Sequence, residues 1–158
     1  MTPKFSLYLG EAGQASATSY FLASGWNVAT PKVDVGDDLV VIEDDQGFFV
    51  RIQVKTAQSI ERKGSFGVRF KVPLKQLQKQ YNPELYYMFM VYRQEDWQHK
   101  VIIPRAALLF EFLDNSIGSV VGDSLMLYMT FQGDKVMCSS VDFSEFYNNF
   151  KDFPRIPH

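Results

Sequence analysis

The stretch that decides the fold begins with GDDLVV at residues 36–41 and ends with IQVKT at residues 52–56. Residues 39–42 form a β-branched apolar run typical of a buried strand, and DDQG at residues 44–47 supplies the turn residues of a hairpin. In the next strand, residues 48–56, side chains alternate so that Gln53 and Lys55 fall on one face. We therefore expect Asp38, at the start of the first strand, to lie near Gln53 and Lys55.

These residues suit phosphodiester chemistry with a hard divalent cation, because such ions take oxygen ligands and activate water. Asp38 offers a carboxylate, Gln53 a side-chain carbonyl and Val54 a backbone carbonyl. The Lys55 amine would stabilise the extra negative charge of the transition state or help orient the attacking water. The residues alone also fit a simpler interpretation, in which Asp38 opens a strand after a turn and Lys55 is a strand-end cation paired with it.

The neighbouring segments predict an α/β core. A helix of about 13 residues should follow Gly10 and end before Gly25, since glycine commonly follows a helix. The further elements expected are a short strand at residues 26–30, a mobile polar loop at 58–67, an added strand at 68–72, a short helix at 74–80 and a central strand at 84–92.

The remaining residues, 93–158, should extend and cover this core. We expect a strand at residues 101–103, a helix at 105–113 and a hairpin that joins 125–131 to 136–139. Asp142 and Glu145 have capping-box spacing, and an aromatic stripe follows at helical spacing: Phe143, Phe146, Tyr147 and Phe150. That stripe is expected to dock on the chain's own sheet, with a dimer surface as the alternative. The tail at residues 154–158 resembles a linker.

Composition bounds the class of protein. A chain of 158 residues, 46% hydrophobic, has material for one compact domain. Cys138 is the only cysteine, so no intramolecular disulfide can form, and we expect it to be a small buried hydrophobe. His99 is expected to be an exposed strand-end residue. The sequence has neither a signal peptide nor a membrane-spanning run, which predicts a soluble cytoplasmic protein.

Charge is unevenly distributed although the net charge is only −2. Six acids and no base lie within residues 34–45, whereas seven bases and one acid lie within residues 55–79. An acidic pocket beside a basic strip suits a metal-assisted enzyme that acts on a polyanion. The candidate phosphate-binding residues of this strip are Arg62, Lys63, Arg69, Lys71, Lys75 and Lys79.

Residues 10–92 resemble the PD-(D/E)xK nuclease superfamily, in particular its intron-encoded and Holliday-junction-resolvase-like members. The matching features are a glycine-led first helix, G-x-D-L-V at residues 36–40, and IQVKT at residues 52–56. The resemblance implies a restriction-endonuclease-like α/β core in the order helix–strand–strand–strand–helix–strand, with a central mixed sheet flanked by helices. It also implies Mg²⁺- or Mn²⁺-dependent hydrolysis of DNA.

The sequence departs from this superfamily at two positions. Gln53 stands where most members carry Asp or Glu, and Gln14 stands where many carry a glutamate on the first helix. Glu11, three residues earlier on the same helical face, is the candidate that could substitute for Gln14. With glutamine at both positions Asp38 would be the lone carboxylate ligand, so we expect weak metal binding.

Three hypotheses remain open at this point. In the first, the protein is an endonuclease, and cutting both strands of a duplex would favour a homodimer or higher homo-oligomer. In the second, the same fold has lost catalysis and serves as a binding module for nucleic acid or protein. In the third, it is a structural or regulatory protein without a site at Asp38.

Overall fold

The computed structural model of the chain, which describes residues 2–151 and residue 153, is built around a five-stranded mixed sheet. Its strands are β1 (Asn27–Ala29), β2 (Leu39–Glu43), β3 (Phe48–Gln58), β6 (Leu85–Arg93) and β7 (Asp96–Pro104), side by side in that order. β3 and β6 are parallel, and every other neighbouring pair is antiparallel. This confirms the expected α/β class with a central mixed sheet.

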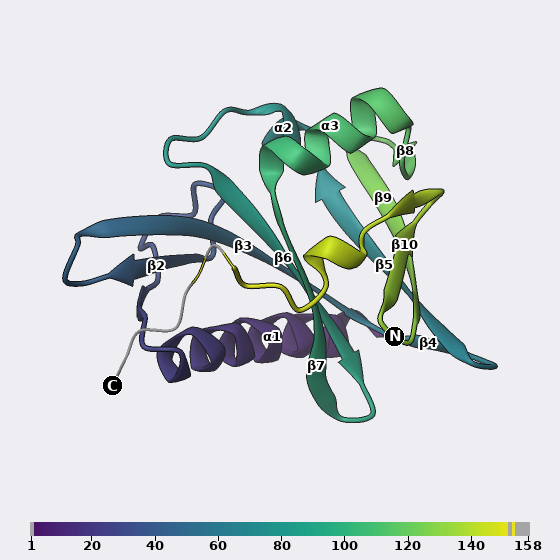
Figure 1. Cartoon of the computed structure of the whole chain (residues 1–158), viewed down its shortest axis with the longest axis horizontal. Coiled ribbons are helices and arrows are strands. Elements are labelled where there is room, and N and C mark those ends of the chain that lie inside the picture. The colour runs from purple at the N-terminus through teal and green to yellow at the C-terminus, as the bar shows by residue number, and fades with distance from the viewer. Residues whose placement is uncertain (1, 152, 154–158) are drawn as a thin grey trace.

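Helix α1 (Pro3–Ala23) covers one face of this sheet (Figure 1). The predicted start after Gly10 is wrong, because the helix begins about two turns earlier. The Thr2 side chain caps it by accepting a hydrogen bond from the Phe5 N–H, and Pro3 occupies its first turn. Its end is as predicted, since Gly25 has a φ of 91°.

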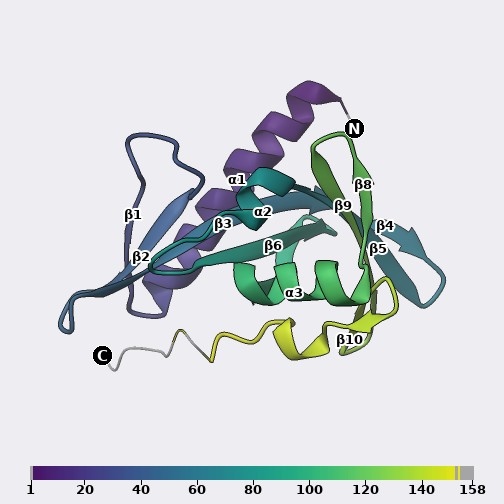
Figure 2. The ribbon, with the colours of Figure 1, turned by 90° about the horizontal axis from the view of Figure 1, so that it is seen from above.

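The opposite face carries a second, antiparallel sheet (Figures 1 and 2). Its main path is β11 (Val141–Asp142), β10 (Lys135–Cys138), β9 (Ser124–Gln132), β5 (Ser65–Pro73) and β4 (Ile60–Arg62), with β8 (Ser119–Val121) also paired to β9. The mobile loop predicted at residues 58–67 is therefore wrong. Those residues end β3, form β4 and begin β5, and Gly64 turns the chain with a φ of 75°.

Helices α2 (Leu74–Gln78) and α3 (Arg105–Asn115) lie on the same side as the second sheet (Figure 2). One hydrophobic core joins the two sheets, with Phe70 of β5 and Phe89 of β6 in ring contact at 4.8 Å between centroids. A second core lies between the five-stranded sheet and α1 and includes Phe21, Ile52 and Met88. Within the described part of the chain, no helix is long and apolar enough to cross a membrane.

The C-terminal helix predicted from the aromatic stripe is wrong. Only a 3-10 turn, η1 (Ser144–Phe146), forms there. The segment's polar groups are used elsewhere: the Ser144 hydroxyl accepts from the Val136 N–H, and the Asn148 N–H donates to the Lys100 carbonyl. The stripe still docks on its own domain, since Phe143 is fully buried. The predicted linker at residues 154–158 lies outside the described residues.

Cys138 and His99 both lie at least partly inside the fold. Cys138 is buried, as expected, and burial raises the pKa of its thiol to about 12. His99 is half-buried against the Phe66 ring and contacts the Tyr147 hydroxyl, so its predicted exposure is wrong. Burial, followed by the nearby charge of Arg93, lowers the His99 pKa.

Two glycines of α1 give a matched test of this packing. A Cβ at Gly13 would overlap Thr56 Cγ2 of β3, whereas a Cβ at Gly10 would meet only Thr56 Oγ1 at 3.9 Å. Gly13→Ala should therefore lower the free energy of unfolding by about 1–3 kcal/mol through overpacking. Gly10→Ala should raise it by up to about 1 kcal/mol through helix propensity.

Urea unfolding of both variants checks this, and Thr56→Ser should recover most of the loss in the Gly13→Ala background. Equal effects of the two alanines would contradict the close approach of α1 to β3.

Candidate functional site

The β2–β3 hairpin brings Asp38 and Gln53 into direct contact. The Asp38 N–H donates to the Ile52 carbonyl at 2.8 Å, which extends the ladder one residue beyond β2 and sets Asp38 opposite Gln53. Asp38 Oδ2 then accepts hydrogen bonds from Gln53 Nε2 at 2.7 Å and from the Val54 N–H at 2.9 Å. The convergence of Asp38, Gln53 and Val54 expected from the sequence is thus present.

Lys55 follows two residues later on the same face of β3 and is half-buried. Burial lowers the pKa of its amine, and the carboxylates of Asp38 and Asp34 act against that shift. Burial also raises the pKa of Asp38, opposed first by the Val54 N–H and then by the charge of Lys55. Desolvation therefore outweighs attraction at both groups, and each charged form depends on the other.

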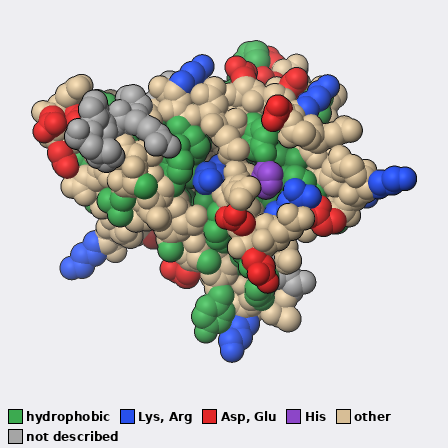
Figure 3. Space-filling view, turned by 60° about the horizontal axis from the view of Figure 1, so that its bottom comes forward, with side chains coloured by type: hydrophobic (Ala, Val, Ile, Leu, Met, Phe, Trp, Pro, Cys, Tyr) green, Lys and Arg blue, Asp and Glu red, His purple; other side chains and the backbone are tan. Residues whose placement is uncertain are grey.

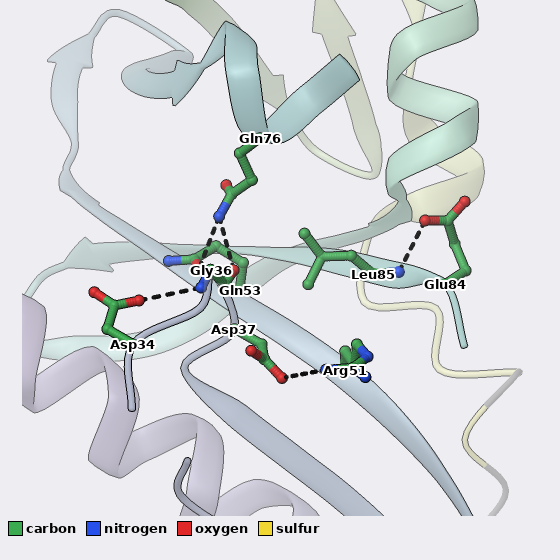
Figure 4. Close-up of polar contacts among 8 residues, drawn as sticks. All are labelled: Asp34, Gly36, Asp37, Arg51, Gln53, Gln76, Glu84 and Leu85. Atoms are coloured by element: carbon green, nitrogen blue, oxygen red, sulfur yellow. Dashed lines mark hydrogen bonds and ion pairs between the residues drawn. The ribbon is translucent and has the colours of Figure 1, made fainter. Parts of the chain in front are cut away.

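Gln76 of α2 closes the site from above (Figure 4). Its Nε2 donates to the Gly36 carbonyl at 2.7 Å and to Gln53 Oε1 at 3.2 Å. Gly36 has a φ of 103°, and a Cβ there would lie 2.8 Å from the Tyr81 hydroxyl. The glycine of G-x-D-L-V is required both by its backbone conformation and by this close approach.

The buried Asp37 carboxylate forms an ion pair with the partly exposed Arg51, with Oδ2 3.2 Å from Nη1 (Figure 4). Asp37 Oδ1, Arg51 Nε and Gln76 Oε1 are buried without a hydrogen-bond partner among the described residues. Sequence reasoning missed Gln76 and the Asp37–Arg51 pair. The alternation of β3, which puts Arg51 on the face of Gln53, was the one signal that could have indicated the pair.

Glu11 and Gln14 do not join the site. The α1 helix packs on the opposite face of β3, where Gly13 approaches Thr56, whereas Gln53 and Lys55 face α2 and the second sheet. Glu11 is exposed beside Leu7 and Tyr8. Among the described residues no hydrogen bond or ion pair joins Glu11 or Gln14 to Asp38, so neither residue adds a ligand there.

The predicted basic strip falls into two groups. Arg62, Arg69 and Lys71 lie on the outer, exposed face of the second sheet, with Lys63 at the β4–β5 turn. Lys75 and Lys79 of the α2 segment line a hollow that also contains Gly36 and Gln76. Lys75 and Lys79 are therefore adjacent to Asp38 and Gln53. The basic residues on the outer face of the second sheet are connected to them through β5.

The oxygen atoms that could hold a cation are the Asp38 carboxylate, Gln53 Oε1 and the Val54 carbonyl. Over the residues that the structure describes, no three His, Cys, Asp or Glu side chains gather in a way that could hold a metal ion. The donor set formed by Asp38, Gln53 and Val54 contains one carboxylate, and the charges of Asp34 and Asp37 act on it.

The electrostatic coupling across the site gives a direct test. Lys55→Met should raise the Asp38 pKa further above its ordinary value of 3.8, because the variant removes a positive charge that lowers it. Carboxyl chemical shifts followed by NMR across the acid range measure this. Lys71→Met, which changes an exposed amine of β5, is the control and should leave the Asp38 titration unchanged; an unchanged titration in both variants would contradict the coupling.

No protein-family model matches the chain, and no curated protein gives a significant match. Among solved structures, the bacterial homing endonuclease I-Ssp6803I is similar over 75% of this chain and 71% of its own, at 22% sequence identity and a TM-score of 0.45. This likeness assigns the chain to no family.

Proposed function

We propose that the protein is a divalent-metal-dependent endonuclease that hydrolyses DNA phosphodiester bonds. The observation that carries the proposal is the meeting of one carboxylate, one amide and one amine at the end of the β2–β3 hairpin. Asp38 and Gln53 are in hydrogen-bond contact, and the charge of Lys55 acts on the Asp38 pKa. The simpler interpretation, a turn residue paired with a strand-end cation, gives no reason for the amide contact or for the burial of Lys55.

The donor set fits a hard divalent cation such as Mg²⁺ or Mn²⁺. Both hydrogen bonds of the Asp38 carboxylate are accepted by Oδ2, which leaves Oδ1 for a cation. Gln53 Oε1 and the Val54 carbonyl would supply further hard oxygen ligands. Since Gln53 Oε1 accepts from Gln76, a cation would compete with that hydrogen bond. The single carboxylate and this competition both favour weak binding.

When bound, the cation would polarise the phosphate and lower the pKa of a water molecule. The residues have complementary tasks. The Val54 N–H and Gln53 Nε2 fix the orientation of the Asp38 carboxylate. The Lys55 amine, held on the same face, would stabilise the charge that develops on the phosphate. An incoming phosphate would also raise the Lys55 pKa and so favour the protonated amine that this task requires.

Substitutions at the site should distinguish the residue that binds the cation from the residue that stabilises the transition state. Asp38→Asn should abolish cleavage and weaken Mn²⁺ binding, because it removes the charged ligand. Lys55→Met should reduce cleavage by roughly 100-fold or more while Mn²⁺ still binds, because it removes transition-state stabilisation. Gln53→Glu should tighten Mn²⁺ binding. The measurements are nicking of supercoiled, linear and branched DNA, and Mn²⁺ binding by calorimetry.

Asp142→Asn, at an exposed carboxylate of β11, is the matched control for Asp38→Asn and should leave cleavage unchanged. In the active protein the rate should fall as the pH is lowered through the raised Asp38 pKa, since the protonated acid binds cations poorly. Wild-type protein that leaves all three DNA forms intact with Mg²⁺ and with Mn²⁺ would defeat the proposal.

The second candidate function is a catalytically inactive nuclease fold that binds nucleic acid or protein. It is favoured by one observation: the Asp38 carboxylate already accepts two hydrogen bonds, and among the described residues no three His, Cys, Asp or Glu side chains gather in a way that could hold a metal ion. For nucleic acid, affinity should fall steeply with salt, and the slope should shrink by roughly one for each phosphate contact removed when Lys71 and Lys75 are neutralised. A slope near zero in titrations at several salt concentrations would indicate a protein partner instead.

A further inference from the structure

The outer face of the second sheet carries an open groove that the chemistry at Asp38 does not use. Its floor is formed by β5 and β9 and its rim by β4 and β8. The residues that line it combine basic, polar and apolar side chains, among them Arg62, Arg69, Val121, Met126, Tyr128 and Thr130. The groove contains no acidic side chain among its described lining residues.

Tyr128 occupies a particular position in this groove. It lies opposite Arg69 in the β5–β9 ladder, and its phenol end reaches diagonally to Gly67, where a Cβ would overlap the hydroxyl and lie 2.7 Å from Cζ. The ring therefore lies across the two strands instead of standing out from them. Arg62 Nε donates to the Tyr128 hydroxyl at 3.2 Å and holds the ring in place.

The cations around this ring are available to a ligand. Arg69 and Lys71 are exposed on the same face of β5, and Arg62 is exposed at its side. None of the three forms an ion pair with another described residue. By contrast, acidic and basic side chains are interspersed on the side of the molecule where α1 lies, which is turned toward the viewer in Figure 3.

We infer that this groove binds a single-stranded segment of DNA, with Tyr128 as the stacking surface for one base and Arg62, Arg69 and Lys71 as phosphate contacts. Unpaired cations select a polyanion, and the apolar floor favours a strand whose base faces are free, because the bases of a duplex are stacked on one another. Aromatic side chains in a basic groove are the usual means of binding single strands.

The groove also leads toward the candidate active site. Arg69, Lys71 and Pro73 share the outer face of β5, and Pro73 lines the hollow that contains Gly36 and Gln76. Arg69 and Pro73 are four residues apart, or roughly 13 Å along a strand. The inference rests on the proposed action on DNA and names its substrate class: DNA with an unpaired strand beside the scissile phosphate.

The test measures binding without metal, so that it is independent of cleavage. Fluorescence anisotropy of a labelled single-stranded oligonucleotide in EDTA would compare wild type with Tyr128→Ala, which should bind about ten-fold more weakly or worse. Tyr128→Phe should retain most of the affinity because the ring is kept. Tyr8→Ala is the control, since Tyr8 is an exposed tyrosine next to a lysine on α1 and outside the groove.

A second measurement is specific to stacking. An oligonucleotide with one 2-aminopurine should lose fluorescence on binding to wild type and not on binding to Tyr128→Ala, while circular dichroism shows that the variant is folded. Duplex affinity should change less than two-fold. Equal losses for single strand and duplex, or retained quenching in Tyr128→Ala, would overturn the inference. If the protein cleaves DNA but binds no single strand, the inference about the groove is overturned and the proposed endonuclease function stands. If it neither cleaves DNA nor binds a single strand, the inference and the proposed function are both defeated.

Discussion

The parallel pairing of β3 with β6 is the constraint on which the rest of the structure depends. Neighbouring parallel strands cannot be joined by a tight turn, so the chain must cross back over one face of the sheet. Here that crossover consists of β4, β5 and α2. It places Gln76 over Gln53, and β5 becomes the strand on which β9 assembles the second sheet. The site at Asp38 and the groove on the second sheet thus both depend on the crossover between β3 and β6.

Within the site, desolvation and attraction oppose each other. Asp38 and Lys55 are both half-buried, and burial shifts each pKa in the direction that favours the uncharged group. The neighbouring acid, Asp37, is paired with Arg51. Two adjacent aspartates therefore have different tasks: Asp37 is committed to an ion pair, whereas Asp38 keeps an oxygen that a cation could take.

Local sequence patterns correctly predicted the β2–β3 hairpin, which is determined by interactions between residues close together in the chain. The alternation in residues 48–56 and the turn at 44–47 were sufficient to place Asp38 beside Gln53, because a hairpin fixes its own register. Patterns could not predict the second sheet, since its central pairing joins β5 to β9 about 60 residues later in the chain. The same limit explains why Gln76 was missed and why Glu11 was placed wrongly: the face of the sheet that a helix covers is decided by tertiary packing. The C-terminal aromatics have helical spacing, yet the Phe143 N–H donates to the Val136 carbonyl of β10 and Tyr147 forms a β-bridge with Val101 of β7.

The hydrogen bonding of β5 has a geometric consequence. From Phe66 to Pro73 the strand is paired with β9, and its first residues are also paired with β4, so it can be neither stretched nor slid. A strand of DNA held at Tyr128 would therefore meet Asp38 at one constant offset. Inserting a single residue into β5 would turn the following side chains to the opposite face, and inserting two would lengthen the offset by roughly 7 Å. The number of residues in β5 would thus set the distance between a bound DNA strand and Asp38.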